Sequence, residues 1–136
     1  MTKADFRAMR ELVGYSQQAL ASVLGIDQRT IRRWEDETCD SHASEEAVEL
    51  LQSALSVQSQ MVDYALQVAE AQSNDFGKAP KVIHLTYYRD QDSYDRFGRD
   101  EGYCGIANAN SRAAAAELKR HGYEVEFRYP SEEVMP

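Results

Sequence analysis

The sequence is poor in the residues that build disulfides, metal sites and irregular loops. It holds two Cys, three Pro and seven Gly among 136 residues. Cys39 and Cys104 lack the paired spacing of a zinc site or a redox motif, so we expect both to be ordinary thiols. The three histidines are dispersed, and no ligand cluster predicts a metal or another cofactor. The low Pro and Gly content and 43% hydrophobic residues exclude a disordered or fibrous chain and predict a globular one.

Long apolar runs are absent as well. No stretch reaches the roughly 18 apolar residues that a membrane span needs. No basic start followed by an apolar run predicts a signal peptide. We therefore expect a cytoplasmic protein with no membrane partner.

Positive charge is scarce overall but unevenly distributed. The formal net charge is −8. Residues 1–36 hold six Lys and Arg against five Asp and Glu, residues 37–80 hold one against eight, and residues 81–136 hold eight against ten. The acidic excess therefore lies mostly in the middle of the chain. Because phosphate attraction acts within a Debye length of about 8 Å, a basic face at the N-terminal end is enough to allow nucleic-acid binding.

The N-terminal part predicts three short helices. Apolar residues recur at helical spacing over residues 3–13. Ser16 is a good N-cap for a second helix, which Gly25 ends at a position that favours a left-handed backbone. Asp27 can cap a third helix.

A long fourth helix is expected over residues 47–71, with Ser44 as its cap. Its apolar positions come close to a 3–4 alternation, which is compatible with a seam between two copies or with packing of the helix on its own domain. These positions are Val48, Leu51, Leu55, Val62, Ala65 and Ala69.

The remaining residues predict a small α/β unit. Its elements are read from five segments: a strand in KVIHLTYYR, a short helix in DQDSYDRFGRDEG, a second short strand in YCGIANA, a helix in NSRAAAAELKRHG capped by Asn110 or Ser111, and a final strand in YEVEFRYP. The expected fold is a mainly α N-terminal helix-turn-helix bundle with a small C-terminal α/β (α+β) unit.

The second and third predicted helices have the form of a helix-turn-helix. Ala21 is small where the two helices approach, and Gly25 follows four residues later in the turn. Ile31 and Trp34 anchor the third helix inward. The polar residues on the remaining arc can then face a DNA major groove.

These polar residues have the chemistry that base reading needs. Arg can bond guanine in a bidentate manner and Gln can do so with adenine, each pair being worth about 1–3 kcal/mol of discrimination. Gln17 begins the second helix, where its backbone N–H and side chain can meet a phosphate. Arg32 lies furthest round the third helix, so contact with the DNA backbone alone is an alternative for it. The candidate DNA-contacting residues are Gln17, Gln28, Arg29, Thr30, Arg32 and Arg33.

An ordinary solvated helix face is the alternative reading of these arginines. A solvated surface helix would not need a small residue, a turn glycine and apolar anchors at the observed spacings. The combined pattern therefore favours DNA binding. Arg10 and Glu35 are interpreted differently, as a buried or half-buried structural ion pair between the first and third helices.

The stretch SQQALASVLGIDQRTIRRWE resembles the XRE (Cro/C1-type) helix-turn-helix family. The resemblance covers residues 6–36. It implies DNA contacts at Gln17, Gln28, Arg29 and Arg33, with Thr30 and Arg32 flanking them. Such proteins bind palindromic operators as dimers and repress transcription. The order of the later parts, with VIHLTYY and then YCGIANANSRAAAAELKRHGYEVEF, is similar to YdiL-like proteins and to anti-CRISPR-associated autorepressors. That resemblance implies a C-terminal unit that mediates dimerisation.

We therefore expect a helix-turn-helix DNA-binding domain with a long fourth helix over residues 1–72, a linker over residues 73–80 and a small α/β dimerisation domain over residues 81–136. The expected function is a dimeric transcriptional regulator, a repressor that binds double-stranded operator DNA. An antitoxin is the alternative, in which the C-terminal unit binds a toxin protein.

Two other functions are less well supported by the C-terminal residues. Tyrosines and arginines there could bind RNA, but the interleaved acidic residues would repel phosphate. His84, Asp90, Asp92 and Cys104 form no recognisable nucleophile–base pair, and no glycine loop is present to cradle phosphate, so we expect no catalytic residues and no enzyme activity.

Overall fold

The computed structural model describes residues 1–78 and 82–133 of the chain. The chain divides into two compact units, Met1–Val57 and Gln58–Pro136. The division falls within one long helix, so each unit contains part of that helix. The units are described separately below.

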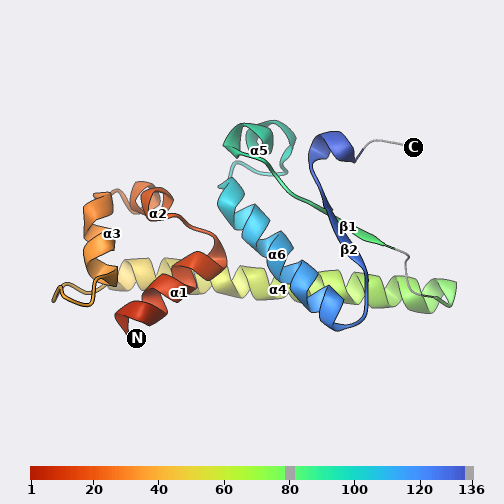
Figure 1. Cartoon of the computed structure of the whole chain (residues 1–136), viewed down its shortest axis with the longest axis horizontal. Helices are drawn as coiled ribbons and strands as arrows, with labels where there is room; N and C mark the ends of the chain where they lie inside the picture. Colours follow the sequence, from red (N-terminus) through yellow and green to blue (C-terminus); the bar gives the residue numbers. More distant parts are fainter. Residues whose placement is uncertain (79–81, 134–136) are drawn as a thin grey trace. The chain divides into compact units, whose positions relative to one another are not determined.

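The first unit is helical. It contains α1 (Lys3–Val13), α2 (Gln17–Leu24), α3 (Gln28–Glu35) and the beginning of α4 (Glu45–Phe76), all labelled in Figure 1. The three predicted N-terminal helices are confirmed. The predicted caps Ser16, Asp27 and Ser44 are confirmed as well. The Ser16 hydroxyl accepts a hydrogen bond from the Ala19 N–H at 3.0 Å, and the Ser44 hydroxyl accepts one from the Ala47 N–H at 3.1 Å.

The core of the first unit joins all four helices. Phe6, Leu20, Ile31 and Leu51 are almost fully buried. The Phe6 and Trp34 rings meet edge to face, with centroids 5.8 Å apart. Burying each large apolar side chain contributes about 1.5–3 kcal/mol, so the core rather than intrinsic propensity holds these short helices.

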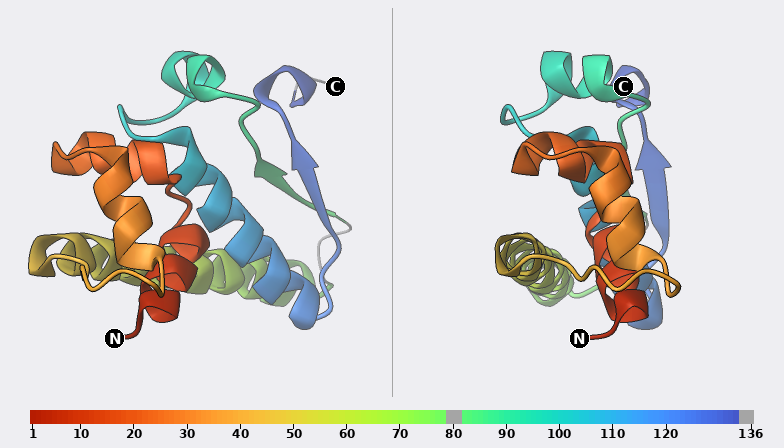
Figure 2. Two further views of the ribbon diagram at one scale, coloured as in Figure 1. Left: turned by 60° about the vertical axis from the view of Figure 1, so that its left-hand side comes forward. Right: turned by 90° about the vertical axis from the view of Figure 1, so that its left-hand side faces the viewer.

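The second unit is built around a βαβ arrangement. After the end of α4 come β1 (Ile83–Thr86), α5 (Gln91–Phe97), α6 (Cys104–Arg120), β2 (Val125–Arg128) and a short 3-10 turn over Pro130–Glu132. The two strands are parallel, and α6 lies beside both of them in Figures 1 and 2. Parallel strands need such a crossover connection. The predicted fold class is confirmed.

One predicted strand is wrong. Residues 104–109 form the first part of helix α6 instead of a strand, with Tyr103 as the N-cap. Asn110 and Ser111 lie inside that helix rather than capping it. The Cys104 N–H at the helix start donates to the Gln91 side-chain oxygen at 2.9 Å, so a residue from α5 supplies the bond that a local cap would have made.

The reason for this helix is a contact distant in sequence. The Asn108 side chain makes two hydrogen bonds with the backbone of Tyr88, accepting from its N–H and donating to its carbonyl, both at 2.8 Å. The Ser111 hydroxyl donates to the Thr86 carbonyl at 3.0 Å. Side chains of α6 therefore satisfy the backbone at the end of β1, which a neighbouring strand would otherwise do.

The predicted linker coincides in part with α4. Residues 73–76 form the end of that helix, and residues 79 and 80 lie outside the described residues. Ser73, the first residue of the predicted linker, contacts the rest of the second unit, because its hydroxyl lies 3.4 Å from the Tyr123 hydroxyl. The division into residues 1–72, 73–80 and 81–136 therefore stays a prediction.

The apolar positions predicted for the fourth helix face the interior of its own units. Leu51 and Ala69 are buried, and the other four positions are half-buried. Of the two alternatives, a seam between copies or packing of the helix on its own domain, these six positions agree with packing within the chain.

Candidate nucleic-acid interface

Helix α3 is fixed at both of its ends. At the N-terminus, the Asp27 carboxylate accepts a hydrogen bond from the Arg29 N–H at 2.8 Å. At the C-terminus, the Lys3 ammonium donates to the carbonyls of Arg33 and Trp34, at 3.0 and 3.1 Å, and also to that of Ser41. A carboxylate at the start of a helix and a cation at its end both match the helix dipole.

The middle of α3 is fixed by burial. Ile31 is 0% exposed and Trp34 is 7% exposed. At 3.6 residues per turn, Arg29 and Arg33 lie about 40° apart on the side away from these two anchors. Both arginines are exposed. The sequence thus presents two cations on the outer face of an anchored helix.

The turn between α2 and α3 sets how these two helices meet. Gly25 has a left-handed backbone with φ of 68°, and a Cβ placed there would meet nothing within 4 Å. Glycine is therefore favoured by backbone conformation rather than by lack of space. The Ile26 N–H donates to the Ala21 carbonyl at 3.0 Å, and Ala21 is buried where the helices approach.

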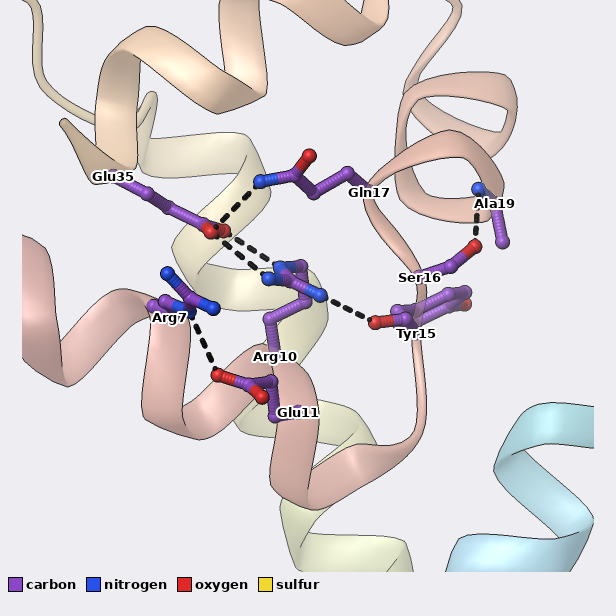
Figure 3. Close-up of polar contacts among 8 residues, drawn as sticks. All are labelled: Arg7, Arg10, Glu11, Tyr15, Ser16, Gln17, Ala19 and Glu35. Carbon is purple, nitrogen blue, oxygen red and sulfur yellow. Dashed lines mark hydrogen bonds and ion pairs between the residues drawn. The ribbon is translucent and has the colours of Figure 1, made fainter.

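A buried ion pair joins α1 to the end of α3, as Figure 3 shows. The Arg10 guanidinium makes two hydrogen bonds to the Glu35 carboxylate, at 2.6 and 2.8 Å, and a third to the Tyr15 carbonyl at 2.9 Å. Both charged side chains are almost fully buried. The structure brings together the two residues that the sequence analysis assigned to a structural pair.

Gln17 belongs to the same network. Its side-chain N–H donates to the Glu35 carboxylate at 3.0 Å, so this amide is oriented from within the domain (Figure 3). The backbone N–H groups in the first turn of any α-helix have no acceptor within that helix. At the start of α2, the Ala19 N–H is bonded to the Ser16 hydroxyl, whereas the Gln17 and Gln18 N–H groups can donate to a phosphate oxygen while the Gln17 side chain stays bonded to Glu35.

Arg29 is bound to its own helix cap. Its guanidinium lies 3.2 Å from one Asp27 carboxylate oxygen and 3.4 Å from the other. These side-chain bonds, followed by the bond from the Arg29 N–H, lower the pKa of Asp27 below its usual value. Asp27 is therefore ionised at neutral pH, and Arg29 must leave it or share it in order to reach a base.

The other candidates lie around the same face. Arg32 is exposed, while Gln28 and Thr30 are half-buried. Thr30 is within the first turn of α3, where its N–H donates to the Asp27 carbonyl at 3.0 Å. The exposed face of α3 thus carries three arginines, partly offset by the Asp27 carboxylate.

Residues 6–60 match the helix-turn-helix family model HTH_3. This is the XRE type of helix-turn-helix, a DNA-binding family. The match includes all of α2, α3 and the turn between them, and it supports a DNA-binding regulator. Comparison with curated proteins gave no match.

Within residues 1–78 and 82–133, no group of three or more His, Cys, Asp or Glu residues is placed to hold a metal ion. Among the same residues, no helix combines the length and apolar character needed to cross a membrane.

Sequence reasoning missed two contributors to this interface. Lys3 was not recognised, because a lysine at the start of one helix gives no local signal that it caps the end of another. Asp27 was recognised as a cap but not as the partner of the Arg29 side chain. The sequence did offer a signal for this pair, because a carboxylate that caps a helix start can reach an arginine side chain two residues later.

Proposed function

We propose that this protein is a sequence-specific transcriptional regulator that represses its own operon. It binds a palindromic operator by placing α3 in the major groove. The observation that carries the proposal is the exposed arginine face of α3 opposite the buried Ile31 and Trp34. The match of residues 6–60 to a helix-turn-helix family model supports it.

Each candidate residue has a distinct role in this proposal. Gln28, Arg29 and Arg33 face bases, where Gln suits adenine and Arg suits guanine. Arg32 and Thr30 flank them and meet the DNA backbone. Gln17 and the start of α2 bind a phosphate and fix the register of α3 on the duplex.

Two copies act together on the operator. One recognition helix reads only a few base pairs, so a second half-site roughly doubles the specific free energy. The contact between copies lies outside the DNA-binding helices, and the sequence resemblance assigns it to the C-terminal residues 81–136.

The first test removes the base-reading arginines one at a time. Arg29→Ala and Arg33→Ala should each weaken binding about 5- to 150-fold per half-site, the effect of losing one bidentate base contact, and more on the whole operator, because both copies lose it. A gel shift on a duplex selected by the protein measures this, and circular dichroism shows that the fold is retained.

The matched control is Arg7→Ala. Arg7 is an exposed arginine of the same unit, and its side chain is paired with Glu11 on α1 at 2.9 Å. This variant should bind the operator almost as well as the natural protein. If both α3 variants also bind with unchanged affinity, α3 is not the reading helix.

A further inference from the structure

Helix α4 carries a second apolar face besides the one that packs within its own units. Four large apolar residues on this helix are exposed: Val57 by 50%, Met61 by 48%, Tyr64 by 69% and Val68 by 38%. We call these four residues the α4 stripe. Such a continuous apolar row on a helix is unusual for a surface in contact with water and is typical of an interaction site.

The spacing of the α4 stripe is that of a coiled coil. The steps between its members are four, three and four residues, and a further step of three reaches the exposed Ala71. A row with an average spacing of 3.5 residues keeps facing one partner helix when the two helices wrap around each other. From position 57 to position 71 the row extends about 21 Å at 1.5 Å per residue. The partner that fits is therefore another helix.

The charges around the α4 stripe restrict which helix this is. Asp63 is the single charged residue between Leu50 and Ala69, in a chain with 28% charged residues. No Lys or Arg occurs between Arg33 and Lys78. An anionic membrane surface or a nucleic acid would require basic residues beside the stripe. A highly charged partner helix would lose hydration without gaining an opposite charge.

The α4 helix of a second copy of this chain meets these requirements. It presents the same apolar row with the same neutral Gln, Ser and Ala flanks, so the two surfaces match without bringing like charges together. Met61 is already held in place at the edge of the row, because the Asn110 side-chain N–H donates to its sulfur at 3.2 Å.

We propose that the α4 stripe is the surface through which two copies of this chain dimerise. The proposal rests on the proposed function, which requires two copies on one operator, and it moves their contact from residues 81–136 to α4. Exposed aromatic side chains within residues 81–136 come from separate elements, such as Phe97 on α5 and Phe127 on β2. Phe127 lines a cavity of about 400 Å³ together with Arg112 and Arg128, so its surroundings are charged.

The test introduces one negative charge on each side of α4 in the full-length chain. Tyr64→Glu places a carboxylate in the α4 stripe, and Ser59→Glu places one at an exposed position on the opposite side of the same helix. Sedimentation equilibrium should give twice the 15.4 kDa chain mass for the natural protein and for Ser59→Glu. It should give a single chain mass for Tyr64→Glu, with unchanged circular dichroism.

Two results would overturn the proposal: a natural protein that sediments as a single chain, or a Tyr64→Glu variant that remains a dimer. If Tyr64→Glu fails to fold, Val68→Gln is measured instead, because it removes an apolar member of the row without adding charge and should still raise the dimer dissociation constant. An unchanged constant for folded Val68→Gln would contradict the proposal.

A DNA measurement separates this inference from the proposed function. Monomeric Tyr64→Glu should still bind a single half-site, and Arg33→Ala should abolish that binding. Loss of the dimer with half-site binding retained supports both ideas. A dimer that depends on Tyr64 but selects no DNA sequence would refute the proposed function alone.

Discussion

At the scale of single residues, Asp27 has two opposed effects on the proposed reading helix. Its carboxylate caps α3 by accepting from the Arg29 N–H, which stabilises the helix. The same carboxylate holds the Arg29 guanidinium and places a negative charge beside the exposed arginines of α3. The free protein therefore keeps Arg29 occupied until DNA competes for it, which favours binding sites that offer a strong acceptor such as guanine.

Replacing Asp27 with Asn separates these two effects. Asn is as good an N-cap as Asp, but it carries no charge to hold Arg29. Asp27→Asn should bind random-sequence DNA several-fold more tightly while the melting temperature stays close to that of the natural protein. Fluorescence anisotropy on a random duplex measures the affinity, and weaker binding would show that Asp27 itself contributes to DNA contact.

The pH dependence follows the same logic. The bonds from Arg29 lower the pKa of Asp27, so the stabilisation from this ion pair is present above the unfolded-state pKa. It is lost as the pH falls through the lower folded-state pKa. Within the neutral range, Asp27 therefore stays ionised and its hold on Arg29 does not change.

At the scale of elements, α3 owes its stability to its neighbours. A helix of eight residues is too short to persist alone in water. Its start is capped by Asp27, its inner face is buried through Ile31, and its end is bound by Lys3 and by the Arg10–Glu35 pair. These contacts hold the backbone of α3 in place while its outer arginines stay exposed.

Lys3 is the contact whose role can be tested most cleanly. Lys3→Met keeps the apolar stem of the side chain but removes its hydrogen-bond donors. The free energy of unfolding should fall by about 1 kcal/mol, the usual contribution of a cation at a helix C-terminus. Operator binding should also weaken, because the end of α3 loses a restraint. Chemical denaturation measures the first effect.

The control is Lys78→Met, which removes an exposed lysine just past the end of α4. It should leave the free energy of unfolding unchanged. If Lys3→Met has no larger effect than this control, the C-terminal bonds of α3 contribute nothing measurable to stability.

The elements differ in how far sequence could predict them. The helices α1, α2 and α3 were predictable because their caps and turn glycines are local signals, as at Ser16 and Gly25. Residues 103–109 were not, because the helix there depends on hydrogen bonds between Asn108 and Tyr88, 20 residues away. The α4 stripe was missed because helical spacing alone does not tell which of two apolar faces is buried.

At the scale of the whole molecule, charge is separated along the sequence. The arginines of α3 belong to a segment with a slight positive excess, whereas residues 37–80 hold eight acidic residues and one lysine. Negative charge in this middle segment opposes loose binding to any DNA, because phosphate attraction is independent of sequence. Occupancy then depends more strongly on correct base contacts, as a regulator of specific genes requires.

Selection of DNA from a random duplex pool by the purified full-length protein tests the central claim most directly. We expect sequencing of the bound fragments to give a palindrome whose half-sites lie about one helical turn apart, or a multiple of it. The double variant Arg29→Ala, Arg33→Ala should enrich no such sequence. If the natural protein enriches no sequence, or if the double variant enriches the same palindrome, then α3 does not read DNA and the account is wrong.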